Sequence, residues 1–174
     1  MSRTFRFAIA GVLALSLILL ATQVWAGPRK QGTVPLPPNS GQGIKCNTNK
    51  GGSSWWNGTV TAEVVGSCTF NVTAIDSVTA VEKYGPAPEG KAYYAHVLNV
   101  AINGAATFMQ VCFAYPPELE AKNARIHFFK DGKWVEEEGK IVDGPPRQLC
   151  YSSDDSPDAK FMLQGADFAL IGDQ

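Results

Sequence analysis

Two histidines, His96 and His127, are the side chains of this sequence best suited to general acid–base chemistry. A small hydrolase would place such a base beside a nucleophilic Ser and an orienting Asp. Both histidines fall in segments of strand composition, away from any Gly-x-Ser-x-Gly turn or glycine-rich loop. We therefore predict a protein without catalytic residues. A small secreted hydrolase is kept as an alternative, and it requires one histidine to lie within hydrogen-bonding distance of a Ser and an Asp.

A pair of adjacent tryptophans, Trp55 and Trp56, suggests sugar binding, because an aromatic face offers apolar contact to the C–H groups of a sugar ring. The pair follows a Gly-Gly-Ser-Ser segment and so lies on or beside a loop, where ligands are often bound. With Tyr93 it forms a candidate ligand platform. The interpretation we favour is structural, with one tryptophan packed against the core near Cys46 and Cys68 and the other half-exposed.

Three carboxylates, those of Asp154, Asp155 and Asp158, lie within five residues of one another. Clustered oxygen ligands are what Ca²⁺ prefers, which makes this segment a weak candidate for a calcium site. The spacing is not that of an EF-hand loop, and the glycine and terminal glutamate of such a loop are missing. A solvated acidic turn is the interpretation we favour. No phosphate-binding or dinucleotide-binding glycine pattern is present, so no cofactor is predicted.

The first 26 residues have the form of a secretory signal peptide. Residues 1–6 contain two arginines and no acid, and residues 7–24 are almost wholly apolar. Val24 and Ala26 then supply small side chains at the −3 and −1 positions of a cleavage site. We predict cleavage after Ala26 and a secreted or cell-surface protein that no longer contacts the membrane. An uncleaved membrane anchor is the alternative, because the apolar run approaches the length of about 17–25 residues that spans a bilayer.

Four cysteines, Cys46, Cys68, Cys112 and Cys150, all follow this predicted signal peptide. Exported chains meet oxidising conditions, and an even number of cysteines predicts up to two disulfides, with three pairings open. No two cysteines have C-x-x-C spacing, and neither histidine is near a cysteine in the sequence. These spacings argue against a zinc site or a redox centre.

Length and charge exclude several classes of protein. A chain of 174 residues is long enough for one domain, or for a domain with a tail. The hydrophobic content of 45% and the net charge of −1 exclude an intrinsically disordered protein. The near-neutral balance also argues against a nucleic-acid partner, which usually requires a basic face. Loss of Arg3 and Arg6 with the signal peptide would change the net charge to −3.

The remaining chain has the composition of a short leader followed by an all-β domain. Residues 27–43 are rich in Pro and Gly and predict a flexible leader, which leaves residues 44–174 as a single domain. Segments rich in Val, Thr and aromatic residues predict about ten short strands in an antiparallel β-sandwich, Ig-like or related. The expected strands are 59–65, 69–75, 77–83, 92–102, 106–115, 125–130, 133–135, 141–142, 148–152, 161–163 and 167–171.

Turn signals and side-chain alternation complete the expected fold. Asn103-Gly104 and Asp131-Gly132 predict two-residue hairpin turns, since both dipeptides favour positive φ. Residues 117–123 begin with Pro and predict a short helical turn. Alternation in the strand 125–130 predicts that Ile126 and Phe128 point inward, while Arg125 and His127 point outward.

From about residue 94 to residue 172 the order of features resembles a β-sandwich module found, often C-terminally, in large secreted and surface proteins of environmental bacteria. The resemblance is carried by the segments Val111-Cys112-Phe113-Ala114-Tyr115, Lys133-Trp134-Val135, Leu149-Cys150 and Phe168-Ala169-Leu170. It implies a bacterial source, no catalytic residues, and a disulfide between Cys112 and Cys150, which leaves Cys46 to pair with Cys68. The acidic segments 136–138 and 154–158 depart from the module.

Together these features predict a secreted, non-catalytic β-sandwich protein that serves as a structural or protein-interaction module at the bacterial cell surface or outside the cell. Its expected partner is an envelope protein or a glycan. A carbohydrate-binding module that uses exposed aromatic side chains is the first alternative.

Overall fold

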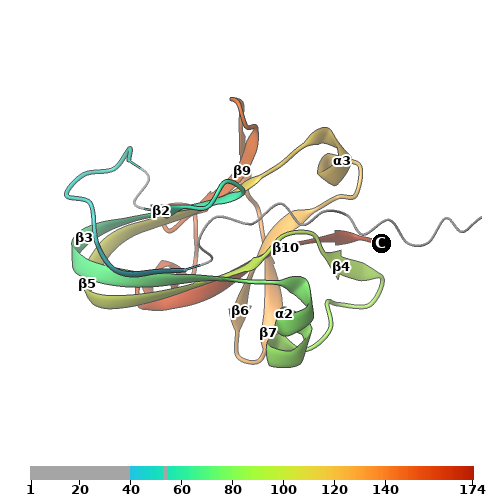
Figure 1. The fold of residues 1–174 in the computed structure, drawn as a ribbon, viewed down its shortest axis with the longest axis horizontal. Helices are drawn as coiled ribbons and strands as arrows, with labels where there is room; N and C mark the ends of the chain where they lie inside the picture. Colours follow the sequence, from blue (N-terminus) through green and yellow to red (C-terminus); the bar gives the residue numbers. More distant parts are fainter. Residues whose placement is uncertain (1–39, 53–54) are drawn as a thin grey trace, which may run out of the picture. The chain divides into compact units, whose positions relative to one another are not determined.

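The computed structural model describes residues 40–52 and 55–174, and this part of the chain is built around a continuous antiparallel sheet (Figure 1). The predicted signal peptide and the leader up to residue 39 lie outside the described residues. The sheet begins four residues before the expected domain boundary, because the first strand starts at Ser40. The prediction of an all-β fold with two disulfides is confirmed.

Ten strands and three helices are found in the described residues. The strands are β1 (Ser40–Lys45), β2 (Trp55–Trp56), β3 (Val60–Ile75), β4 (Lys91–Tyr93), β5 (Val97–Ala114), β6 (Arg125–Lys130), β7 (Lys133–Glu137), β8 (Lys140–Val142), β9 (Gln148–Ser152) and β10 (Gly165–Asp173). The helices are α2 (Ser77–Tyr84), α3 (Pro117–Glu120) and α4 (Ala159–Met162). The strand order is β1-β3-β5-β10-β6-β7, with β2 on β3, β4 on β10, and β9 and then β8 on β5.

Two long strands, β3 and β5, pair along their whole length and pass from one layer of the fold to the other. The bend lies where their register shifts between Val65 and Gly66. Gly66 has a φ of 143° and Gly104 has a φ of 112°, and a Cβ on either residue would lie within 3 Å of the backbone of the opposite strand. Strands that change sheets in this way usually do so through a bulge or a glycine.

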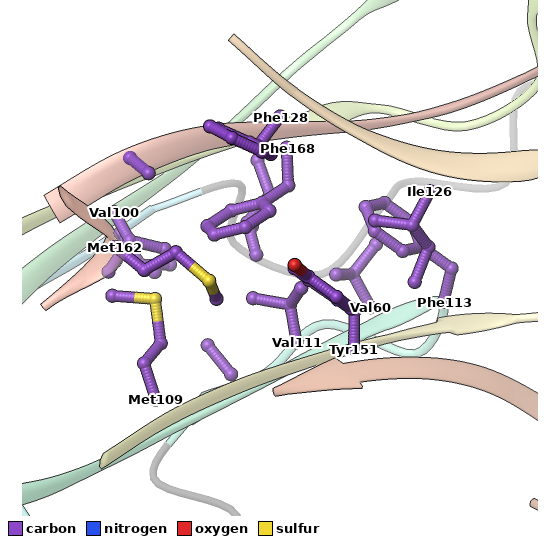
Figure 2. Packing of buried hydrophobic residues seen from close by; sticks show 14 of the residues in the cluster. Val60, Val100, Met109, Val111, Phe113, Ile126, Phe128, Tyr151, Met162 and Phe168 are labelled. Atoms are coloured by element: carbon purple, nitrogen blue, oxygen red, sulfur yellow. The ribbon is translucent and has the colours of Figure 1, made fainter. Parts of the chain in front are cut away.

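The bend divides the sheet into two layers that face each other. The first layer contains β1, β10, β6, β7, β4 and the adjoining halves of β3 and β5; the second contains β2, β9, β8 and the other halves. Figure 2 shows buried side chains from the two layers pointing toward one another, with Met162 of α4 among them. The labelled side chains are Val100, Ile126, Phe128 and Phe168 from the first layer, and Val60, Met109, Val111, Phe113 and Tyr151 from the second.

Helix α2 covers part of the outer face of the first layer. Its Ala80 is fully buried in a second apolar cluster with Val97, Ala169 and Ile171. Tyr84, at the end of the helix, packs edge-on against Phe129, with ring centroids 5.0 Å apart. The helix is therefore fixed to the sheet by its buried side.

The two disulfides join Cys46 to Cys68 and Cys112 to Cys150, which is the pairing that the resemblance implied. Cys112 and Cys150 are directly opposite each other on β5 and β9. The other bridge ties the end of β1 to β3 beside the bend. Stable disulfides of this kind indicate that the chain folds in an oxidising compartment. None of the helices in the described part has the length and apolarity needed to cross a membrane.

Several local predictions were wrong, each for an identifiable reason. Asn103-Gly104 is not a hairpin turn; it lies inside β5, where Gly104 allows the bend. The segment 77–83 is helical because the Asp76 side chain accepts hydrogen bonds from the Val78 and Thr79 amides and so caps α2, which outweighs its Val and Thr content. Residues 161–163 end a short helix instead of forming a strand.

Other local predictions are confirmed. The Asp131-Gly132 turn joins β6 to β7, and both of its residues have positive φ. Ile126 and Phe128 are fully buried in the core. His127 does lie on the opposite face of β6, but it is buried, with 5% of its surface exposed. The reason is that this face is not open to solvent: the residue opposite His127 is Ala169, a member of the cluster beneath α2.

Candidate functional site

His96 lines a cleft of about 450 Å³ that also includes Asp76 and Ser77, so the residue types of a hydrolytic triad are near one another. The Asp76 carboxylate is already engaged. Its Oδ1 accepts from the Val78 and Thr79 amides, each at 3.0 Å, and its Oδ2 accepts from the Thr79 hydroxyl at 2.8 Å. The Thr79 bonds are the main reason that the pKa of Asp76 is lowered. No hydrogen bond joins His96 to the described residues, so these side chains form no triad.

His127 is held by backbone instead of by catalytic partners. Its Nδ1 lies 3.1 Å from the Arg125 carbonyl oxygen, and its Nε2 lies 3.7 Å from a carboxylate oxygen of Glu136. Burial lowers the pKa of His127, and this effect exceeds the opposing effects of the Arg125 carbonyl and Glu136. The native environment therefore favours the neutral form of this imidazole.

The lowered pKa of His127 makes stability depend on pH. Below about pH 6.5 the unfolded chain takes up a proton on this histidine more readily than the native chain does, so the free energy of unfolding falls as pH decreases. We expect urea unfolding at pH 7, 6 and 5 to show this decline, and His127→Gln to reduce it. His96→Gln, the control, should leave the slope in place. An unchanged slope in His127→Gln would contradict this interpretation.

The three aspartates proposed as a weak calcium site each form an ion pair with a different lysine. Asp154 pairs with Lys50. Lys140 Nζ lies 2.6 Å from Asp155 Oδ1, and Lys130 Nζ lies 2.6 Å from Asp158 Oδ1. The carboxylates therefore diverge toward three separate cations. Among the described residues no group of three or more His, Cys, Asp or Glu side chains is arranged to hold a metal ion.

The three aromatic residues of the proposed platform do not share one surface. Trp55 is half-buried and packs against the main core, whereas Trp56 is 61% exposed. The two side chains point to opposite faces because they are consecutive residues of β2. Tyr93 belongs to the cluster beneath α2, where its hydroxyl accepts a hydrogen bond from Trp134 Nε1 at 2.7 Å. Trp56 alone is available for stacking on a ligand.

An apolar groove beside α2 was missed by the sequence analysis. It has a volume of about 680 Å³ and lies between the helix and the segment 86–92. Val78 and Val81 form its rim and are 70% and 44% exposed. The signals that could have revealed it are Asp76 and Gly85, a helix start and a helix stop, which place the two valines on one helical face.

Comparison of the chain with protein-family models, with curated proteins and with solved structures finds no match. The site must therefore be interpreted from its own geometry.

Proposed function

We propose that the protein is a secreted, non-catalytic interaction module that binds an apolar segment of another protein in the groove beside α2. The observation that carries this proposal is the exposure of Val78 and Val81 at the rim of an apolar groove. Exposed apolar side chains that gather at a groove are typical of a contact surface, whereas those scattered singly are ordinary. Burial of Val78 and Val81 by a partner would contribute about 1–3 kcal/mol to binding.

The groove is built on a rigid element. The Asp76 cap fixes the start of α2, and the buried Ala80 and the partly buried Tyr84 fix its inner face. The Tyr93 hydroxyl donates to the Gly85 carbonyl at 3.0 Å, which ties the chain after the helix to β4. A rigid groove needs little ordering on binding, which removes one part of the entropic cost of association.

The charges around the groove favour a partner segment that carries basic residues. Glu82 and Glu89 line the groove and have no ion-pair partner among the described residues. The lysine of the lining, Lys91, is already paired with Asp173 at 2.5 Å. The uncompensated charge is therefore negative, and Lys or Arg beside the apolar anchors of the partner would complement it.

The setting of this interaction is also part of the proposal. Two disulfides and the signal-like residues 1–26 support export, and the resemblance of the second half of the chain supports a bacterial cell surface. The module would then act on an envelope or extracellular protein. The engaged Asp76 carboxylate and the backbone-held His127 support a role without catalysis.

A peptide selection tests the groove directly. Peptides displayed on phage are selected on the exported, disulfide-intact protein and then measured on Val78→Asp/Val81→Asp. We expect apolar peptides flanked by Lys or Arg, with at least a tenfold loss of affinity in the variant, because each substitution puts a charge where an apolar side chain must dock. Binding should also weaken as salt increases.

Val142→Asp provides the matched control, since Val142 is 48% exposed on β8 but lies outside the groove. It should bind the selected peptides like the native protein. Selection of no peptide, or of peptides that bind both variants equally, would contradict the proposal.

A further inference from the structure

The outer face of the second layer carries polar side chains in adjoining rows. Antiparallel partners point to the same face of a sheet. Trp56 is opposite Thr61, and Thr61 is opposite Cys112, which makes one row across β2, β3 and β5. In the next row Glu63 is opposite Gln110. The residues between these positions point to the opposite face of the sheet, into the core, so the polar face lies on the outside of the layer.

A cavity of about 220 Å³ opens on this face, next to the turn that contains Gly51 and Gly52. Its polar lining consists of the Thr61 hydroxyl, the Glu63 carboxylate and the amides of Gln110 and Gln148. The Cys112–Cys150 disulfide underlies it and joins the two strands that present the amides. This volume is below the range of about 300–1,000 Å³ typical of pockets for drug-sized ligands, so the cavity suits a single small ring.

Glu63 sets the charge of the cavity. It is 8% exposed, and its Oε1 accepts hydrogen bonds from the Gly51 amide at 2.7 Å and the Gly52 amide at 3.1 Å. These bonds hold the carboxylate in place at the cavity wall. A fixed negative charge in a partly buried site repels anions, so phosphate groups and acidic sugars do not fit this site.

Three half-buried polar side chains, those of Thr61, Gln110 and Gln148, line the same cavity. None of them forms a side-chain hydrogen bond with any residue that the structure describes. An amide side chain offers both donors and an acceptor, and a hydroxyl offers the same combination. This pattern complements the hydroxyl groups of a neutral sugar, each of which also donates and accepts.

Trp56 supplies an apolar surface beside these polar groups. Its indole is 61% exposed and shares a face with Thr61, its cross-strand partner. The preceding residue, Trp55, packs against the core on the opposite side and anchors the two-residue strand. The aromatic ring lies on the same face as the cavity, two strands from Gln110, so the face offers the two kinds of contact that a carbohydrate needs, one for a C–H face and one for hydroxyls.

We propose that Trp56 and this cavity together bind two neighbouring sugar residues of a neutral oligosaccharide. The hydroxyls of one residue bond to Gln110, Gln148 and Thr61 in the cavity, and the adjoining residue stacks on the Trp56 indole. This site is independent of the groove beside α2, which lies on the outer face of the other layer. It differs from the platform expected from the sequence, because Tyr93 has no part in it and Trp55 acts through the backbone of β2.

The test begins with an array of neutral and acidic oligosaccharides, probed with the disulfide-intact protein. We expect binding to at least one neutral glycan and to no acidic one. The oligosaccharide bound best is then titrated by calorimetry into the native protein and into Trp56→Ala, Trp56→Phe, Gln110→Ala and Gln148→Ala. The three alanine variants should lose at least tenfold in affinity, whereas Trp56→Phe should stay within a few-fold, because a phenyl ring can still stack.

Matched controls separate this site from the rest of the surface. Gln164→Ala removes an exposed amide just before β10, outside the cavity lining, and Val78→Ala alters the groove beside α2; both should bind the sugar like the native protein. Urea unfolding of each variant confirms that the fold is kept. The proposal is overturned if no neutral glycan binds, if acidic glycans bind better, or if binding survives both Trp56→Ala and Gln148→Ala.

Discussion

Replacing Cys112 and Cys150 together by alanine should lower the free energy of unfolding by about 4 kcal/mol. The bridge closes a sequence separation of 38 residues, and its loss returns that loop entropy to the unfolded chain. Both cysteines are also buried, at opposite positions on β5 and β9, so packing is lost as well. Urea unfolding followed by tryptophan fluorescence measures the difference.

The matched variant, Cys46→Ala/Cys68→Ala, opens a loop with a sequence separation of 22 residues and should cost about 3 kcal/mol. We therefore also predict that loss of the Cys112–Cys150 bridge destabilises the fold more than loss of the Cys46–Cys68 bridge does. A loss of less than about 1 kcal/mol for the Cys112 and Cys150 pair would show that this bridge does little to stabilise the fold.

Gly104→Ala should destabilise the protein by about 2–4 kcal/mol, through backbone strain and overpacking at the bend. Gly104 has a φ of 112°, and an added Cβ would lie 2.7 Å from the Ser67 carbonyl oxygen and 3.0 Å from the Cys68 Cα. These are backbone atoms of the paired strand, so relief requires β3 and β5 to separate where both pass between the layers. Urea unfolding again provides the measurement.

Gly132→Ala separates the effect of backbone strain from that of overpacking. Gly132 also has a positive φ, 77°, but nothing lies within 4 Å of a Cβ built on it. This variant should cost only about 1 kcal/mol, the usual penalty for a left-handed conformation. Equal costs at the two positions would mean that the close approach of the strands at Gly104 is unimportant.

These two glycines also show how far local sequence signals can be trusted. Asp131-Gly132 and Asn103-Gly104 carry the same turn signal, yet one forms a hairpin and the other lies in the middle of an 18-residue strand. The difference arises from pairing distant in sequence, because the whole of β5 from Val97 to Phe113 is matched by β3. A signal two residues long contains no information about such a partner.

The pattern of β-rich segments was more informative than any single turn. It predicted the antiparallel class and the inward faces of Ile126 and Phe128, since alternation is a property of the strand itself. It failed at α2, where one side-chain cap at Asp76 outweighs the β propensity of its Val and Thr residues. The groove lies beside that helix, so the sequence pattern that missed the helix could not predict the groove either.

Only one part of the proposed sugar site, Trp56, could be predicted from the sequence. Trp56 was singled out, but its neighbours in space are Thr61 and, one strand further, residues of β5. Gln110 and Gln148 lie far apart along the chain and line the same cavity only because β5 pairs with β9. The three aspartates were likewise read as a group, whereas their lysine partners come from three other segments.

The groove beside α2 is tested most directly by titrating a selected peptide into isotope-labelled protein and following the backbone amides by two-dimensional NMR. We expect the largest shifts at Val78, Val81 and the segment 86–92, with little change at Thr61 and Gln110 on the other layer. Shifts spread evenly over the sheet, or concentrated on the face that carries Trp56, would contradict the proposal that α2 presents the protein-binding surface.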